Sequence, residues 1–325
     1  RLMRLLYADQ GRAHAAGAID DDRRVLVEQP ALDLRLEVAA GDVDGDGLSD
    51  LLWSIGYDAP LDSSAGRSFL FLGGDLPVAP ESATLDENDA TYGFAGETLL
   101  DFSGASLSMT GDVDGDGLAD VMISAHGSNE LATNAGKLSL FFASDLSQSP
   151  EETLTSLGDA SVTLLGPTPD LFLAREHATG DIDGDGDVDL WLSQYKLPYV
   201  KGQMPTPIYD ANDGFPGYLL LNDGTGRLTD STAKAGLAAK RLRRSYSASF
   251  ADIDDDRDLD LVVVSDFAGV DIYLNDSKGK FTDATDRLVG NRYGFGMAHT
   301  FADYDADGRM DFLMIGMNSW AVERL

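Results

Sequence analysis

Short apolar runs, each placed directly after an aspartate-rich turn, form the main pattern along the chain. A continuous run of three or four apolar residues suits a β-strand that is buried on both faces. Helical periodicity is not sustained anywhere, so the pattern predicts an all-β fold. The five runs lie at residues 51–53, 121–123, 190–192, 261–264 and 312–315.

Further strand-like runs follow each of the first four. Residues 68–72 and 138–142 are each followed by a short acidic turn, and they predict the third strand of a sheet. In the later repeats, residues 218–221 and 272–274 lead into Asn-Asp-Gly and Asn-Asp-Ser turns, which is hairpin chemistry. Each repeat therefore contains enough strands for a small antiparallel sheet.

The turn before each of the five runs repeats in register as DxDxDxxxD, with the aspartates at positions 1, 3, 5 and 9 of the loop. Successive copies begin 70, 69, 71 and 51 residues apart, which leaves room for one four-stranded sheet per repeat. The five loops are residues 42–50, 112–120, 181–189, 252–260 and 303–311, and they are called loops 1 to 5 below.

Four carboxylates at this spacing, with the backbone carbonyl of position 7, form the oxygen-rich ligand set that calcium prefers. Zinc would require histidine or thiolate ligands, and magnesium takes fewer protein ligands in a stricter octahedron. We therefore predict up to five Ca²⁺ ions. The predicted ligands are Asp42, Asp44, Asp46, Leu48 and Asp50; Asp112, Asp114, Asp116, Leu118 and Asp120; Asp181, Asp183, Asp185, Asp187 and Asp189; Asp252, Asp254, Asp256, Asp258 and Asp260; and Asp303, Asp305, Asp307, Arg309 and Asp311.

Position 6 of the loop predicts a difference between the copies. It is glycine in four loops, where it permits the positive φ that turns the chain back toward the metal, and it is Arg257 in loop 4. Loop 4 is therefore predicted to be the weakest site. An EF-hand is excluded because position 12 is an apolar strand residue in every copy and not the bidentate glutamate.

The loops and strands resemble the FG-GAP repeats of integrin α-subunit propellers, most clearly at residues 102–107 leading into loop 2. Around loops 3 to 5, at residues 222–237 and 275–285, the chain is similar to VCBS repeats of bacterial secreted proteins and to the cartilage acidic protein family. The resemblance implies a β-propeller of four-stranded blades, with the calcium loop joining the first two strands of each blade.

Similar propellers usually have seven blades, so the resemblance implies that the five blades at residues 34–325 are part of a larger ring. Residues 1–33 contain strand-like runs at 3–7 and 25–27. These runs could close the ring by pairing with the fifth blade, or belong to a preceding blade. We favour a fragment of a larger propeller.

The composition limits the classes of function that the protein could have. The formal charge of −32 would repel nucleic acids and anionic lipid surfaces, and five Ca²⁺ ions would change it to −22. The absence of cysteine excludes disulfides and thiolate chemistry, and no apolar run is long enough for a membrane helix. Extracellular calcium modules bind at roughly 10⁻⁴–10⁻³ M, which favours a secreted or cell-surface protein.

The function expected from these features is a non-enzymatic interaction module whose partner is a protein or a glycan, with calcium in a structural role. One alternative is a polysaccharide lyase or hydrolase on a propeller scaffold. Another is a structural subunit of a surface assembly. His177 and His299 each lie four residues before a loop, but no nearby serine or carboxylate in the sequence completes a catalytic set.

Three other motifs are more readily explained by structure than by function. The basic cluster at residues 240–244 could meet an anionic partner, but we expect a solvated loop between blades. Residues 145–149 spell DxSxS, a string of metal-adhesion sites, and we expect a simple turn. Asn275-Asp276-Ser277 is a formal glycosylation sequon inside a predicted tight turn.

Overall fold

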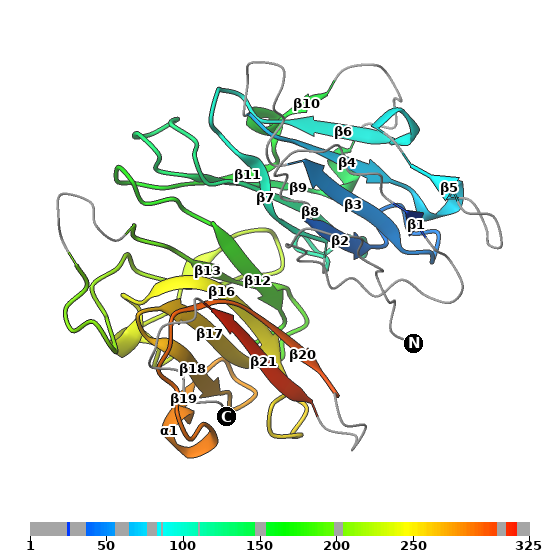
Figure 1. The fold of residues 1–325 in the computed structure, drawn as a ribbon. Helices are drawn as coiled ribbons and strands as arrows, with labels where there is room; N and C mark the ends of the chain where they lie inside the picture. The colour runs from blue at the N-terminus through cyan, green and yellow to red at the C-terminus, as the bar shows by residue number, and fades with distance from the viewer. Residues whose placement is uncertain are drawn as a thin grey trace. The chain divides into compact units, whose positions relative to one another are not determined.

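The computed structural model describes residues 25–26, 37–55, 65–76, 83–85, 87–109, 111–146, 154–197, 204–303 and 310–316. The chain divides into two compact units, Arg1–Leu173 and Ala174–Leu325. Both are built almost entirely from antiparallel β-sheets (Figure 1). No helix in the described residues has the length and the apolar character that crossing a membrane would require.

The first unit contains two sheets that match two repeats. In spatial order, the first sheet contains β10 (Thr155–Ser156), β6 (Tyr92–Ala95), β4 (Arg67–Phe71), β3 (Asp50–Ile55) and β2 (Val38–Gly41). The second contains β11 (Val162–Leu165), β9 (Lys137–Phe141), β8 (Val121–Ala125) and β7 (Ser103–Ser108). Within these sheets only β10 pairs in parallel, with β6 of the neighbouring repeat.

Shorter elements of the first unit lie mainly at the turns. A two-residue strand, β1 (Val25–Leu26), pairs in parallel with β5 (Ala83–Thr84). The other N-terminal run expected to be a strand, residues 3–7, lies outside the described residues. The 3-10 helices are η1 (Gly73–Asp75), η2 (Glu87–Asp89), η3 (Ala143–Asp145) and η4 (Leu157–Asp159).

The second unit contains two four-stranded sheets and one hairpin. The third sheet runs β12 (Glu176–Gly180), β13 (Asp189–Ser193), β14 (Tyr218–Leu221) and β15 (Thr229–Asp230). The fourth runs β16 (Arg244–Ala251), β17 (Asp260–Asp266), β18 (Gly269–Leu274) and β19 (Thr282–Asp283). The hairpin joins β20 (Gly296–Ala302) to β21 (Asp311–Gly316), and the short helices are η6 (Ala238–Lys240) and α1 (Thr285–Leu288).

The second strand of each four-stranded sheet is buried on both faces, as the continuous apolar runs predict. In β17, for example, alternate residues enter two different cores. Leu261 and Val263 pack with Trp191 of the third sheet, whereas Val262 and Val264 pack with Phe312 of the hairpin. An all-β fold of four-stranded antiparallel sheets, consistent with propeller blades, is thereby confirmed.

The strand of the fifth repeat is the exception. The apolar run at 312–315 forms β21, but Leu313 and Ile315 on its second face are exposed. Among the described residues, β21 pairs only with β20, so no third strand lies beside it. The apolar run is similar to that of β17, but among the described residues β21 has one neighbouring strand and β17 has two, which accounts for the difference in burial.

Candidate metal-binding loops

Loops 1 to 4 each connect the first and second strands of a sheet, and each brings three carboxylates together. In every case the residues are those at positions 1, 3 and 9, and one oxygen from each lies within 4.8 Å of the others. Each group could hold a metal ion. The groups are Asp42, Asp44 and Asp50; Asp112, Asp114 and Asp120; Asp181, Asp183 and Asp189; and Asp252, Asp254 and Asp260.

Position 1 shapes the loop through hydrogen bonds from the backbone. The Oδ2 atom of Asp42 accepts a hydrogen bond of 3.0 Å from the N–H of Gly47, at position 6. The same bond recurs in loops 2, 3 and 4, at 2.6, 3.1 and 3.0 Å. This closed turn directs the side chains of positions 1 and 3 to the same side, where the carboxylate of position 9 meets them.

The turn requires positive φ at positions 4 and 6. In loop 1 these are Gly45 and Gly47, with φ of 76° and 83°. Loop 4 has Asp255 and Arg257 instead, with φ of 62° and 78°, a region that costs a residue with a Cβ about 1–2 kcal/mol. Only Arg257 is expected from the sequence to be strained; the second strained residue, Asp255, is found only from the backbone.

Position 9 has a second role that the ligand pattern does not reveal. Asp50 is fully buried, and its Oδ2 and Oδ1 accept hydrogen bonds of 2.7 Å from the N–H groups of Val43 and Gly73. Val43 is the second residue of the loop and Gly73 follows the third strand, so the carboxylate joins the two segments. The same pair of bonds occurs at Asp120, Asp189 and Asp260.

The electrostatics of the loops favour a cation. Burial raises the pKa of Asp120, Asp189 and Asp260 to about 6, even though each accepts two backbone hydrogen bonds. Burial, followed by the neighbouring aspartates, also raises the pKa of Asp183 at position 3 of loop 3. The Oδ1 of Asp183 is buried and has no hydrogen-bond partner among the described residues. A positive charge beside these oxygens would stabilise their ionised forms.

Positions 5 and 7 lie outside the three-carboxylate groups. The Oδ1 atoms of Asp46 and Asp116 accept hydrogen bonds of 2.7 and 2.8 Å from the N–H groups of Leu48 and Leu118. In loops 3 and 4 the corresponding bonds measure 3.0 and 3.2 Å. These bonds leave the other carboxylate oxygen available, so positions 5 and 7 stay predicted ligands.

Loop 5 is described only at its ends. Asp303 follows β20 and Asp311 begins β21, whereas residues 304–309, with Asp305, Asp307 and Arg309, lie outside the described residues. The prediction of a fifth calcium site therefore rests on the sequence alone.

The two histidines lie on first strands, His177 on β12 and His299 on β20. Burial lowers the pKa of each to about 4, so both are neutral at pH 7. No serine is adjacent to His299 in the sequence, but its Nδ1 and Nε2 lie 2.9 Å from the hydroxyls of Ser247 and Ser249 in the structure. Both serines belong to β16, 52 and 50 positions earlier, so adjacency in sequence could not reveal them. In the described part of the chain, no carboxylate hydrogen-bonds to His299.

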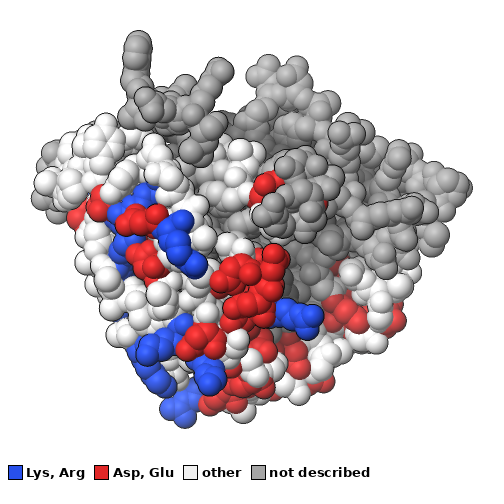
Figure 2. Space-filling model, turned by 90° about the horizontal axis from the view of Figure 1, so that it is seen from below, with Lys and Arg blue, Asp and Glu red and all other residues white. Residues whose placement is uncertain are grey.

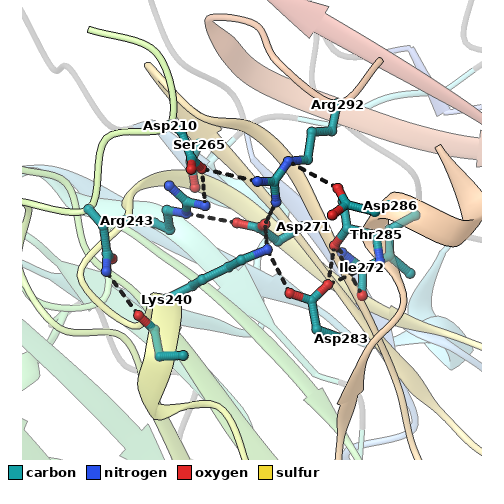
Figure 3. Close-up of polar contacts among 12 residues, drawn as sticks. Asp210, Lys240, Arg243, Ser265, Asp271, Ile272, Asp283, Thr285, Asp286 and Arg292 are labelled. Atoms are coloured by element: carbon teal, nitrogen blue, oxygen red, sulfur yellow. Dashed lines mark hydrogen bonds and ion pairs between the residues drawn. The ribbon is translucent and has the colours of Figure 1, made fainter. Parts of the chain in front are cut away.

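The basic cluster at residues 240–244 is not the solvated loop that we expected. Arg243 and Arg244 are buried, and Arg244 forms a two-pronged ion pair of 3.0 and 2.9 Å with Asp213. The buried carboxylate of Asp271 contacts three cationic side chains (Figure 3). These are Lys240 at 2.7 Å, Arg243 at 2.9 Å and Arg292 at 3.3 Å.

These ion pairs anchor the long connection between β13 and β14. Arg243 donates to the carbonyl of Ala211 at 2.9 Å, and Arg244 donates to that of Lys196 at 2.7 Å. In Figure 2, each group of basic side chains has acidic side chains beside it. The cluster is therefore already paired inside the protein and does not form a free surface for an anion.

The DxSxS string is described only at its start. Asp145 ends the 3-10 helix η3, and its carboxylate accepts a hydrogen bond of 2.7 Å from the hydroxyl of Ser161. Residues 147–149 lie outside the described residues. What is described agrees with the turn that we expected.

Comparison with known families matches two stretches of the chain. A family described as FG-GAP repeat matches residues 103–141, which run from β7 through loop 2 to β9. A family described as FG-GAP-like repeat matches residues 252–314, from loop 4 to β21. The two matches thus fall on the strand, loop and strand units described above, one in each unit of the chain.

Proposed function

Because this chain is an FG-GAP repeat protein, we propose that it is a calcium-stabilised interaction module, secreted or displayed on the cell surface, that binds a protein or a glycan. The observation that carries the proposal is the loop geometry. Four loops place three carboxylates around one point, and one of these carboxylates is buried and joins the loop to the third strand. A cation there would stabilise the blade itself.

The donor set supports calcium over other ions. The grouped ligands are carboxylate oxygens, which are hard donors, and the backbone carbonyl of position 7 is predicted to be a further oxygen ligand. With several carboxylates converging on each point, the site suits an ion that accepts six to eight oxygens at flexible distances, as calcium does.

The partner surface is proposed at the strand ends opposite the calcium loops. Because the strands are antiparallel, the connections between second and third strands lie there, and they differ most between repeats. The connection is two residues long between β17 and β18 but runs from Gln194 to Gly217 between β13 and β14. This longer segment is anchored by buried arginines and exposes Ile208 and Tyr209, which are 44% and 51% accessible.

Calcium removal tests the proposal. In a chain treated with EDTA, the melting temperature should fall and should return when calcium is added, because a ligand at 100 times its Kd adds about 2.7 kcal/mol per site. Magnesium at the same concentration should restore less. An unchanged melting curve after chelation would contradict a structural role for calcium.

We further propose that the chain has no catalytic activity. Turnover assays on acidic and neutral polysaccharides test this directly, with His299→Ala as the informative variant because His299 contacts two serines. Cleavage that depends on His299 would instead support a lyase or hydrolase.

A further inference from the structure

Asn275 occupies an unusual position between two of the candidate metal-binding loops. It follows β18, is 8% exposed, and its N–H, Nδ2 and Oδ1 all form hydrogen bonds. Its Nδ2 donates to the carbonyls of Ile182 at 2.7 Å and Leu259 at 3.1 Å, and its Oδ1 accepts from the N–H of Asp276 at 2.8 Å. Ile182 belongs to loop 3 and Leu259 to loop 4.

A continuous series of hydrogen bonds connects the two loops through this residue. The N–H of Ile182 donates to Oδ2 of Asp189 at 2.9 Å, and the carbonyl of Ile182 accepts from the side chain of Asn275. The N–H of Asn275 donates to Oδ1 of Asp260 at 2.8 Å. The backbone of one residue, Ile182, and the side chain and N–H of Asn275 therefore connect the position 9 carboxylates of loops 3 and 4.

The turn that contains Asn275 also packs against the carboxylates of loop 3. Gly279 has a φ of 68°, and a Cβ at Gly279 would lie 3.1 Å from the Cβ of Asp183. Since Asp183 is in the group at loop 3, displacement of the turn would displace a grouped carboxylate as well.

We propose that Asn275 is a positioning residue that couples metal binding at loop 3 to metal binding at loop 4. Ordering one loop holds Ile182 and Asn275 in place, and this preorganises Asp260 or Asp189 for the other loop. Coupling of this kind is reciprocal, so each loop raises the affinity of the other by the same factor. The inference rests on the proposed function, because it requires that the loops bind calcium.

The same hydrogen bonds bear on whether the sequon at residues 275–277 can be glycosylated. Nδ2 is the atom to which a glycan would be attached, and here it donates to two carbonyls in a buried residue. Attachment would remove at least one of these bonds and would require the turn to open. The hydrogen bonds therefore favour a role for Asn275 as a link between loops 3 and 4 over a role as a glycosylation site.

The first unit connects its loops in another way. The residues equivalent to Asn275 are Gly73 and Ala143, whose side chains cannot reach a neighbouring loop. Loops 1 and 2 are joined by a backbone hydrogen bond of 2.9 Å from the N–H of Ala119 to the carbonyl of Asp42. Of these two pairs of loops, the coupling between loops 3 and 4 is the one that should depend on a side chain at this place.

A double-mutant cycle tests the proposal by isothermal titration of the metal-free full chain with calcium. The contribution of loop 4 is identified as the part of the isotherm that Asp252→Asn removes. Disabling loop 3 with Asp181→Asn should weaken calcium binding at loop 4 by about fivefold or more, the lower end of typical coupling. In Asn275→Ala, the same Asp181→Asn change should have no effect on loop 4.

The control variant is Asn212→Ala, which deletes an equivalent bond of 2.9 Å from an asparagine side chain to the carbonyl of Ala239, away from the loops. It should leave the coupling unchanged. The reciprocal experiment, calcium affinity of loop 3 in Asp252→Asn, needs no change at Asn275 and must give the same factor even if Asn275→Ala does not fold.

Two outcomes would overturn the proposal: loop 4 affinity that is unaffected by Asp181→Asn, or a decrease that persists in Asn275→Ala. If no calcium binds at all, the proposed function fails as well. If calcium binds at both loops independently, only the coupling fails.

Discussion

The two units of the chain complete the same loop with different turns. In the first unit, the third strand ends in a 3-10 helix that begins with Gly73 or Ala143. In the second, it ends in an Asn-Asp turn that begins with Asn222 or Asn275. In all four, the N–H of that residue donates to Oδ1 of the position 9 aspartate, at 2.7–2.9 Å.

The comparison shows which groups the loop requires and which side chains can vary. Since the donor to the position 9 carboxylate is a backbone N–H, the side chain of that residue is free to vary. The first unit uses small residues there, whereas Asn275 adds a side chain that contacts the neighbouring loop. Conversely, both oxygens of the position 9 carboxylate accept backbone hydrogen bonds in loops 1 to 4, so this residue is not free to vary in the same way.

The largest predicted effect tests whether this shared bond is equally important in both units. Asp120→Ala and Asp260→Ala should each destabilise the protein by roughly 2–5 kcal/mol, because each leaves two buried N–H groups without acceptors. Urea denaturation in EDTA measures the effect without calcium. The control is Asp116→Ala at the exposed position 5, which should cost less than about 1 kcal/mol.

A large loss for Asp120→Ala with little loss for Asp260→Ala would show that the Asn-Asp turn does not depend on the carboxylate. The equivalence of the two units would then be wrong.

A smaller effect is predicted for the backbone strain of loop 4. Arg257→Gly should stabilise the protein by about 1 kcal/mol, because glycine adopts the positive φ at little cost. The matched variant is Gly117→Arg in loop 2, where nothing lies within 4 Å of an added Cβ, so only the conformational cost applies. It should destabilise by a similar amount, as judged by thermal unfolding in EDTA.

The outcome also bears on calcium affinity. If strain makes loop 4 the weakest site, Arg257→Gly should raise its affinity in titration. An affinity that stays the same would show that the surrounding blade compensates for the strain.

The smallest predicted effect is on stability at acidic pH, and it arises from an ion pair in the second unit. The hydrogen bond from Arg244 holds the pKa of Asp213 below its usual value of 3.8. A lowered pKa in the folded state contributes stability that is complete above 3.8 and is lost as the pH falls through the folded value. Asp213→Asn should therefore reduce the fall in the urea midpoint between pH 5 and pH 3. An identical fall in both proteins would rule out this contribution.

The apolar runs and loop residues were sufficient to predict the strands because both signals are local. Continuous apolar runs such as 261–264 indicate a strand whatever follows them. The third strands at 67–71 and 137–141 were also predicted to within one residue at each end, since their turns are local too.

Contacts between residues that are far apart in the chain could not be predicted from the sequence. The arginines at 243 and 244 were expected in a solvated loop because their partners, Asp213 and Asp271, lie about 30 positions away. For the same reason, the serines beside His299 and the amide donors to the position 9 aspartates were missed. A pattern of ligands at positions 1 to 9 says nothing of a donor that follows the third strand.

The short strand β10 has a consequence for how the molecule behaves in a concentrated solution. An exposed outer strand is a template for pairing with another chain, and this is a common origin of aggregation. In the first sheet, Thr155 and Ser156 occupy the free edge of β6. In the third and fourth sheets the outer strands are only two residues long and carry exposed threonine and aspartate. In these three sheets, capping one edge and shortening the outer strand of the other two would limit self-association.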